Sequence, residues 1–325
     1  TSVWVNKDRV HIAGDFDPWF EEEKIFSLIE NLKTLGVTKI KELTFDSRFV
    51  FTDMPQAQHT QVSAALVKNA LLHYFNPTGK LGVIAKERLL SVKKFQEQEG
   101  IDYTLPSSGI PTASIQAVST NPLFNLAGSS IHTHQSKSLI TILKAMNMMS
   151  KNMVAHILWE ESKKISDPIK VFSKYGILPT DISLNNGSGL PVLNGQTRLD
   201  NLANCHSILK ILKALELKAA LLKIEIEEFV AVGTDLGSLK ERFLNDLPLK
   251  ESIAAKTGTL KNSSTLAGWI ESAKPLRFVI LNHVTETLKA RDWQDKFLSQ
   301  WISQTSRPRN YQTEMIYPVD SNFFN

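Results

Sequence analysis

The chain has 325 residues, of which 42% are hydrophobic and 22% are charged, and its formal net charge is +4. This length and composition are typical of a folded protein of about two domains. Basic and acidic residues alternate along the chain, which argues against nucleic-acid binding. The single cysteine, Cys205, excludes an intrachain disulfide. No apolar run is long enough to span a membrane as a helix.

The first 112 residues predict a small α/β domain. Its best-defined helix repeats apolar residues at i, i+3, i+4 and i+7, which places them on one face. A Pro- and Gly-containing stretch at 106–111 is the best linker in the chain, so we place a domain boundary at 112/113. The predicted elements are strands at 4–5 and 9–14, a helix over 21–35, a strand over 40–45, a helix over 62–75 and a strand over 81–85.

Residues 113–305 predict a second, larger domain, and residues 306–325 predict an irregular tail. Apolar periodicity again separates helices from strands. The predicted elements are a strand over 114–118, helices over 138–149 and 152–161, a Gly-, Asn- and Pro-rich loop over 178–193, helices over 199–215 and 216–230, a β-hairpin over 253–270, a strand over 277–283 and a helix over 293–302.

The first strand of that hairpin carries Lys256-Thr257-Gly258-Thr259. Gly258 leaves the main chain uncovered, so a ligand can approach the backbone closely. A cation with two hydroxyls beside such a backbone suits an anionic substrate end. The tripeptide Lys-Thr-Gly also occurs by chance, and an ordinary surface hairpin is the alternative.

A second candidate is the Ser-x-Asn formed by Ser150 and Asn152, between two predicted helices. Both side chains can point into one cleft from such a turn. The same spacing begins at Ser119 and at Ser183, so spacing does not single out Ser150. A Gly-Ser-Gly sequence at 187–189 reads either as part of a site or as a plain turn.

Histidines give no evidence of a metal site. His132, His134 and His156 are not at spacings typical of metal ligands, and no His-Glu-x-x-His pattern is present. No Gly-rich phosphate loop occurs in a strand–turn–helix context. We therefore expect neither a metal nor a cofactor.

Taken together and in this order, these motifs resemble those of the penicillin-recognising serine acyltransferases. More narrowly, the chain is similar to the low-molecular-mass class C penicillin-binding proteins, the D-alanyl-D-alanine carboxypeptidase/endopeptidase family. The Gly-Ser-Gly sequence belongs to a longer match at 186–190, with Asn186 in place of the family's Asp. The resemblance extends further to the segments 10–18, 32–40, 45–49, 134–139 and 233–239, followed by Arg242.

This resemblance implies an α/β (α+β) fold in which a transpeptidase-like domain, an antiparallel sheet flanked by helices, occupies 113–305. The first strands of the accessory domain at 1–112 could pair with it. The implied reaction is acyl transfer from a peptidoglycan stem peptide ending in D-Ala-D-Ala, with β-lactams as inhibitors, outside the cytoplasm or in the periplasm. A non-catalytic peptidoglycan- or peptide-binding homologue is the alternative, and carboxypeptidase and endopeptidase action both stay open.

The resemblance also assigns roles to the site residues. Ser150 relays a proton to the leaving amine, and Asn152 hydrogen-bonds the substrate amide. Lys256 supplies positive potential, and the hydroxyls of Thr257 and Thr259 bind the terminal carboxylate. The N–H of Thr259 is the expected half of an oxyanion hole.

Family members also need a nucleophile in a Ser-x-x-Lys sequence, where the Lys takes the proton of the Ser hydroxyl. In this family that motif lies ahead of the strand matching residues 3–13, so we expect the nucleophile upstream of Thr1. Two other sequences fit the spacing: Ser91 with Lys94, in the right order but in polar surroundings, and Ser207 with Lys210, in the wrong order.

Overall fold

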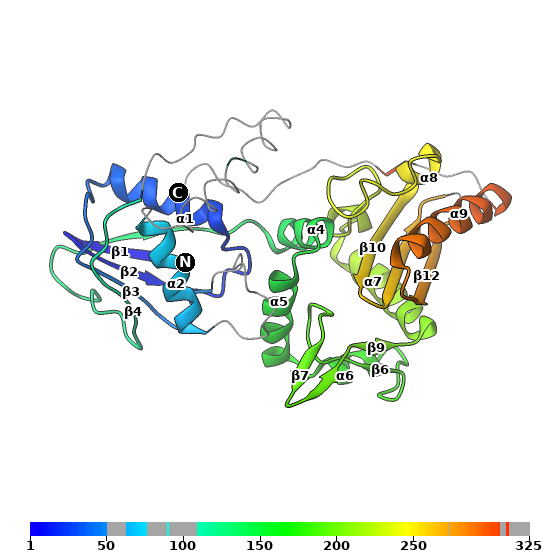
Figure 1. The fold of residues 1–325 in the computed structure, drawn as a ribbon, viewed down its shortest axis with the longest axis horizontal. Coiled ribbons are helices and arrows are strands. Elements are labelled where there is room, and N and C mark those ends of the chain that lie inside the picture. Colours follow the sequence, from blue (N-terminus) through cyan, green and yellow to red (C-terminus); the bar gives the residue numbers. More distant parts are fainter. Residues whose placement is uncertain (51–62, 77–89, 91–108, 273, 306–309, 312–325) are drawn as a thin grey trace. The chain divides into compact units, whose positions relative to one another are not determined.

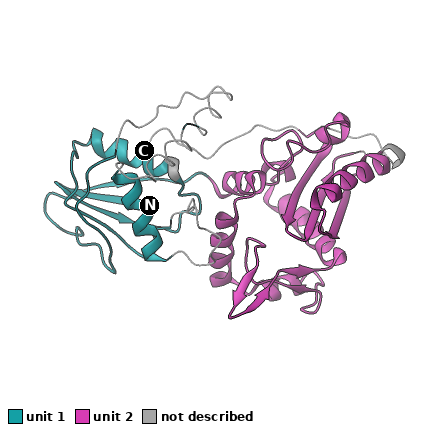
Figure 2. Ribbon diagram, viewed as in Figure 1, with its two compact units in different colours: residues 1–137, 319–325 teal, residues 138–318 magenta. Residues whose placement is uncertain are grey.

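The computed structural model describes residues 1–50, 63–76, 90, 109–272, 274–305 and 310–311. The strand expected at 81–85 and the first half of the linker, residues 106–108, lie outside the described residues. Contacts divide the chain into two compact units, one containing Thr1–Lys137 and the other Ser138–Pro318 (Figure 2).

Unit 1 is built on a five-stranded mixed sheet with the order β4-β3-β2-β1-β5 (Figure 1). Strands β2, β3 and β4 are parallel, whereas β1 pairs antiparallel with β2 and β5. Two of these strands, β4 and β5, follow residue 112, where the sequence places the boundary of the second domain; that boundary stays a prediction. The strands are β1 (Ser2–Asn6), β2 (Arg9–Ala13), β3 (Glu42–Phe45), β4 (Ile115–Ala117) and β5 (Ser130–Thr133).

Two helices cover one face of this sheet, α1 (Glu22–Thr34) and α2 (Ala64–Phe75). The apolar stripe of α1 is fully buried against alternate residues of the strands, as the period-3.6 and period-2 patterns require. The expected strand–helix–strand unit is therefore confirmed. The α1 side chains that form this core are Ile25, Leu28, Ile29 and Leu32.

The turn after β2 packs closely against the residues that follow β3. A Cβ on Gly14 would lie 2.0 Å from the backbone nitrogen of Phe49, so only glycine fits there. Asp17 forms a buried ion pair with Lys24 at 3.0 Å and accepts the N–H of Trp19. Burial alone would raise the pKa of Asp17, but the Lys24 ammonium and the hydrogen bonds outweigh it and hold that pKa below its ordinary value.

The opposite face of the sheet contains a buried histidine. The Nδ1 atom of His11 lies 2.9 Å from the Thr44 hydroxyl oxygen, and no hydrogen-bond partner of its Nε2 is present among the described residues. Burial lowers the pKa of His11, because the charged imidazolium loses its hydration. The folded protein therefore holds His11 neutral at pH values where the unfolded chain binds a proton.

We expect this histidine to make unit 1 less stable in acid. Because the folded pKa is lowered, the stabilisation is complete above the ordinary histidine pKa of about 6.5 and is lost as the pH falls below it. Between pH 7 and 5.5 the wild type should lose about 1 kcal/mol more than His11→Gln, which does not titrate. Hydrogen exchange of the β2 amides at both pH values measures this difference. Equal losses in the two proteins would contradict it.

Unit 2 contains a three-stranded antiparallel sheet with the order β10-β11-β12. Strand β10 (Ile253–Leu260) and strand β11 (Ser263–Ile270) form the predicted hairpin, and β12 (Leu276–His283) follows. A Cβ on Gly268 would lie 2.1 Å from the Ala254 carbonyl oxygen, so this glycine allows the two hairpin strands their close approach. The hairpin register places Lys256 opposite Ala267.

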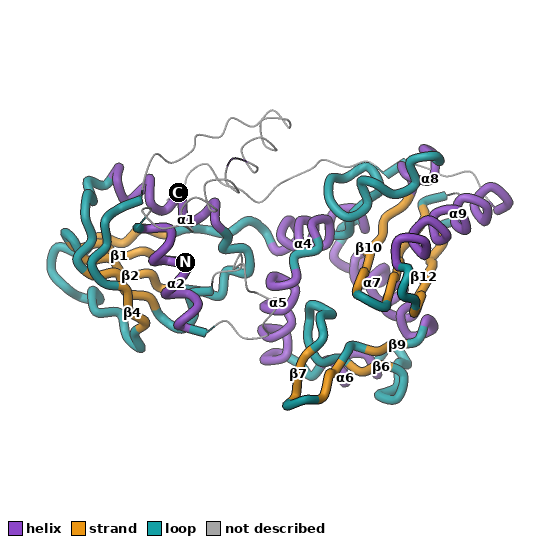
Figure 3. Tube along the Cα trace, viewed as in Figure 1, coloured by secondary structure: helices purple, strands orange, loops and turns teal. Residues whose placement is uncertain are grey.

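Helices cover both faces of this sheet (Figure 3). Helix α9 (Thr287–Thr305) buries Leu298 and Ile302 on one face, and α7 (Cys205–Leu222) buries Leu212 and Ala219 on the other. Helix α4 (Leu139–Met149) contributes apolar side chains to the core on both faces. The sheet flanked by helices confirms the expected fold class. The other elements of unit 2 are α5 (Asn152–Ile165), α6 (Pro168–Ser173), β6 (Ile182–Ser183), β7 (Val192–Asn194), β8 (Thr197–Leu199), β9 (Leu202–Ala203), the 3-10 helix η1 (Ile226–Glu228) and α8 (Leu247–Ser252).

Several element predictions were wrong in detail. One helix, α7, replaces the two expected over 199–215 and 216–230. It crosses the expected break and ends at Lys223, which adopts a left-handed conformation at φ 56° and donates its N–H to the last helical turn. The loop expected over 178–193 contains β6 and the start of the β7–β8 hairpin. The last helix begins at Thr287, six residues before the expected start at Trp293.

Candidate active site

The turn between α4 and α5 presents Ser150. Ser150 ends α4 in a left-handed conformation (φ 55°, ψ 49°), and its N–H donates to the carbonyl of Met146. Asn152 is the first residue of α5, so a two-residue connection separates the helices. A left-handed serine is uncommon, and such strain concentrates at functional sites. Both side chains are exposed, and the predicted Ser-x-Asn between two helices is present.

The structure brings Ser150 and Lys256 together although 106 residues separate them. The Lys256 ammonium donates to the Ser150 hydroxyl at 2.8 Å and to the carbonyl of Thr257, also at 2.8 Å. Burial lowers the pKa of Lys256 to about 8, because the charged ammonium loses water. An appreciable fraction of Lys256 is therefore neutral near physiological pH and can accept a proton.

Strand β10 also offers main-chain groups on its open edge. Gly233 donates its N–H to the carbonyl of Ile253, and Ala255 donates its N–H to the carbonyl of Ala231. The main-chain N–H and C=O groups of these two β10 residues therefore point away from β11. The direction of the main-chain N–H and C=O groups alternates from residue to residue along an antiparallel strand. Those of Thr257 and Thr259 therefore point to the same open edge as those of Ala255. Beyond Ala255, no strand among the described residues pairs with this edge. The N–H of Thr259 is therefore available to a ligand lying along β10.

Gly258 lies between these two threonines and opposite Thr265. A Cβ on Gly258 would lie 2.3 Å from the Thr265 hydroxyl oxygen and 3.7 Å from its Cβ. The Thr265 hydroxyl across the hairpin therefore occupies the space that a side chain at position 258 would need. The glycine of the Lys-Thr-Gly sequence has a packing reason as well as the predicted ligand-binding one.

This packing gives a pair prediction. Gly258→Ala should destabilise the protein by about 1–2 kcal/mol, because it overpacks the hairpin. Thr265→Ala removes the clashing oxygen, so the double variant should recover most of that loss. Urea unfolding of the two single variants and the double variant measures the coupling. Additive effects in the double variant would show that Thr265 is not the obstacle.

The position of Ser150 is fixed by a segment that the sequence did not identify as functional. Lys144, on α4, donates to the carbonyl of Val230 at 2.9 Å and forms a buried ion pair with Asp235. The N–H of Ser238 donates to the carbonyl of Met148 at 3.0 Å. These contacts hold the last two turns of α4, immediately before Ser150.

The same segment, residues 229–238, also holds β10 through the two backbone hydrogen bonds made by Ala231 and Gly233. It therefore connects the helix that presents Ser150 to the strand that presents Lys256, and so helps to set the distance between the two side chains. The sequence carried one signal for it, the similarity of residues 233–242 to the family. Lys144 itself gave no signal, because it is one charge in an apolar helix.

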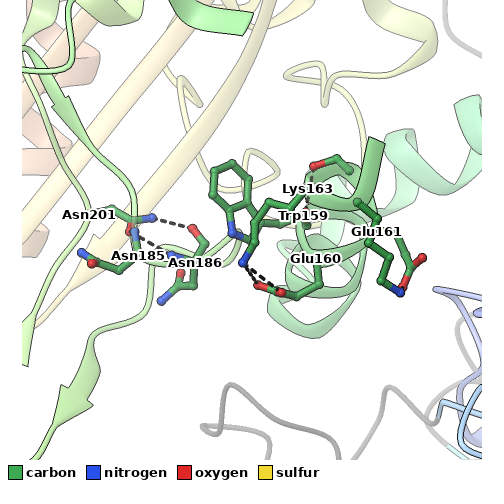
Figure 4. A network of polar contacts seen from close by, with 9 residues as sticks. Trp159, Glu160, Glu161, Lys163, Asn185, Asn186 and Asn201 are labelled. Atoms are coloured by element: carbon green, nitrogen blue, oxygen red, sulfur yellow. Dashed lines mark hydrogen bonds and ion pairs between the residues drawn. The ribbon is translucent and has the colours of Figure 1, made fainter. Parts of the chain in front are cut away.

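The Gly-Ser-Gly loop closes on itself around Asn186. The Asn186 amide oxygen accepts from the Ser188 hydroxyl and from the N–H of Gly189, at 3.1 and 2.7 Å, and its amide nitrogen donates to the carbonyl of Leu190. Figure 4 shows the neighbouring Asn201, which donates to the Asn186 carbonyl at 2.8 Å. The interior of this loop is thus occupied by its own polar groups.

The loop packs on α5, the helix that begins at Asn152. A Cβ on Gly187 would lie 2.4 Å from the carbonyl oxygen of Ala155 and 2.4 Å from the Cβ of Trp159. Trp159 lies beside the Asn186 network in Figure 4, and Lys163 lies over its ring at 6.0 Å. The loop therefore supports α5 by close packing.

The structure separates the members of one Ser-x-x-Lys sequence. Ser207 is fully buried on α7, whereas Lys210 is directed away and donates to the carbonyl of Gly176. Ser207 therefore has neither access to substrate nor a lysine beside its hydroxyl. The other sequence, Ser91 with Lys94, lies outside the described residues.

The described residues contain neither a metal-binding cluster nor a membrane-spanning helix. No group of three or more His, Cys, Asp and Glu side chains there could hold a metal ion. No helix in the described part of the chain is long and apolar enough to cross a membrane.

Solved structures define the class of this fold. The chain is similar to the predatory peptidoglycan endopeptidase Bd3459 from Bdellovibrio bacteriovorus, with a TM-score of 0.79 and 22% identity over 99% of this chain and 84% of that chain. Bd3459 has also been solved acylated by penicillin G, in complex with the immunity protein Bd3460. Penicillin-binding protein 4 from Haemophilus influenzae is similar at a TM-score of 0.55 and 16% identity, over 92% of this chain and 85% of that chain.

These likenesses identify a penicillin-binding-protein-like fold. Residues 104–304 match the family model described as the D-Ala-D-Ala carboxypeptidase 3 (S13) family, which is more than half of the chain. The chain therefore belongs to this family, and the resemblance inferred from its motifs is confirmed. No curated protein matches the sequence.

Proposed function

We propose that this protein is a serine-type peptidase that cleaves D-Ala-D-Ala-terminated stem peptides of peptidoglycan through an acyl-enzyme and is inhibited by penicillin. Membership of the S13 family supports this function, and so does the likeness to Bd3459, a peptidoglycan endopeptidase. The observation that carries it is the 2.8 Å contact between Ser150 and Lys256 beside the open edge of β10.

In this proposal the substrate lies along β10. Lys256 provides positive potential, and the hydroxyls of Thr257 and Thr259 bind the terminal carboxylate beside Gly258. The Thr259 N–H stabilises the oxyanion, a contribution of about 3 kcal/mol in other acyl transferases. Asn152 hydrogen-bonds the substrate amide, and Ser150 passes the proton of the nucleophile to the leaving amine.

The nucleophile itself belongs to a Ser-x-x-Lys sequence, and among the described residues no such pair lies beside Ser150. Whether carboxypeptidase or endopeptidase action dominates depends on the substrate subsites. We also propose a location outside the cytoplasm, because that is where the substrate is. The alternative is a binding protein that keeps the carboxylate pocket and has no nucleophile.

Fluorescent penicillin tests the proposal on the full-length gene product. We expect covalent labelling, slowed by about 100-fold or more in Ser150→Ala because the proton relay is lost. Ser183→Ala, at another exposed Ser-x-Asn serine, should label normally. Labelling abolished by Ser91→Ala would instead place the nucleophile at Ser91. Retained binding of a D-Ala-D-Ala peptide without labelling would overturn the peptidase and support the binding protein.

A further inference from the structure

The contact between Ser150 and Lys256 has chemical consequences of its own. Ser150 is exposed, and its hydroxyl accepts a hydrogen bond from Lys256, a cation on a different element. A hydroxyl within hydrogen-bond reach of an amine is the arrangement by which serine nucleophiles are activated, and serine–lysine pairs are one known form of it. The proposed peptidase uses Ser150 only as a relay.

We propose that Ser150 and Lys256 also form a nucleophile–base pair, so that the Ser150 hydroxyl is itself acylated by small activated carboxylic esters. The substrate class is an ester with a good leaving group and a short acyl chain. This second acylation site requires no Ser-x-x-Lys serine. It therefore stands or falls separately from the proposed peptidase.

The geometry supports each part of this pair. The left-handed turn holds Ser150 beyond the end of α4, where its hydroxyl is accessible from solvent. The Lys256 amine is held on two sides, by the Ser150 hydroxyl and by the carbonyl of Thr257. Among the described residues no carboxylate forms an ion pair with Lys256, so nothing there fixes it in the charged state.

The reaction begins with Lys256 as a neutral amine. As the Ser150 oxygen bonds to the ester carbonyl carbon, the hydroxyl proton moves to the Lys256 nitrogen and the carbonyl becomes an oxyanion. When the intermediate collapses, the bond to the leaving alcohol breaks, the alcohol takes the proton from Lys256, and an O-acyl serine remains.

Lys256 can deprotonate under mild conditions because burial lowers its pKa to about 8. The rate of Ser150 acylation should therefore increase with pH and level off above about 8. The acylation rate of a serine without such a lysine would not level off near that pH. Ser150 is the only side chain hydrogen-bonded to Lys256 among the described residues, so the profile reports on this pair.

The test uses p-nitrophenyl acetate with the chain as it stands, followed by peptide mapping with mass spectrometry. We expect an acetyl group on Ser150 with the pH profile described above. It should be absent from Ser150→Ala and unchanged in Ser183→Ala. An acetyl group on Lys256 in place of Ser150, or none on either residue, would overturn the proposal.

Lys256→Arg separates the base from the charge. Arginine keeps the positive potential but does not deprotonate, so Ser150 acetylation should fall by about 100-fold or more. The matched control is Lys261→Arg, in the turn of the same hairpin, which should acetylate Ser150 at the wild-type rate. Equal acetylation in Lys256→Arg would show that the lysine is not the base.

Two outcomes distinguish this inference from the proposed peptidase. Penicillin labelling without Ser150 acetylation would leave the peptidase standing and exclude the second acylation site. Ser150 acetylation with neither penicillin labelling nor stem-peptide binding would support the second acylation site and exclude the peptidase.

Discussion

Asp235→Ala is expected to destabilise the protein by about 3–5 kcal/mol, because it leaves the Lys144 ammonium buried without its counter-charge. The side chains of this pair are only 6% and 2% exposed. The substitution also removes the acceptor of the Val232 N–H, which donates to the Asp235 carboxylate at 2.8 Å. Urea unfolding measures the loss.

The double variant Lys144→Met with Asp235→Asn tests the explanation. It removes both charges and keeps an acceptor for Val232, so it should be more stable than Asp235→Ala by about 2 kcal/mol. The control is Glu160→Ala, which breaks an exposed ion pair with Lys163 on α5 and should cost less than about 0.5 kcal/mol. If the double variant is no better than Asp235→Ala, the unpaired charge is not the cause.

The pair also connects stability to the site. Lys144 is on α4, six residues before Ser150, and Asp235 is on the segment that bonds to β10. A looser α4 would lengthen the contact between Ser150 and Lys256, so Asp235→Ala should slow Ser150 acetylation at temperatures where the variant is still folded. Small displacements of reacting groups are costly in this way.

The sequence predicted the fold class and the order of the motifs because both depend on local patterns. The hairpin of Lys256 and the helices around Ser150 follow from periodicity and turn residues. Strand β5 was missed because its four residues show no alternation, and only pairing with β1 makes it a strand. Tertiary context decides such short elements.

The candidate site, like the fold, could be predicted from the sequence only in part. The motif residues could be named in advance, but the segment at 229–238 could not, because its role lies in contacts with α4 and β10. A buried charge such as Lys144 shows its purpose only when its partner is located. The 2.8 Å contact between Ser150 and Lys256 likewise needed the structure, because their separation along the chain says nothing about distance in space.

Gly237→Ala is expected to combine a large loss of stability with damage to the site. Gly237 has a φ of +102°, and a Cβ there would lie 2.2 Å from the carbonyl oxygen of Met148. That carbonyl accepts the N–H of Ser238, so the new methyl group would push the segment away from the end of α4. Backbone strain and overpacking together should cost about 3 kcal/mol or more.

Gly195→Ala is the matched control, because Gly195 also has a positive φ, +63°, but no atom lies within 4 Å of its added Cβ. This variant carries only the backbone strain, about 1 kcal/mol, and should acetylate Ser150 at the wild-type rate. Gly237→Ala should acetylate Ser150 more slowly, with a pH profile that no longer levels off at about 8, because Lys256 no longer contacts the hydroxyl. Equal stability losses and an unchanged profile in the two variants would mean that the Met148 contact does not hold Ser150 in place.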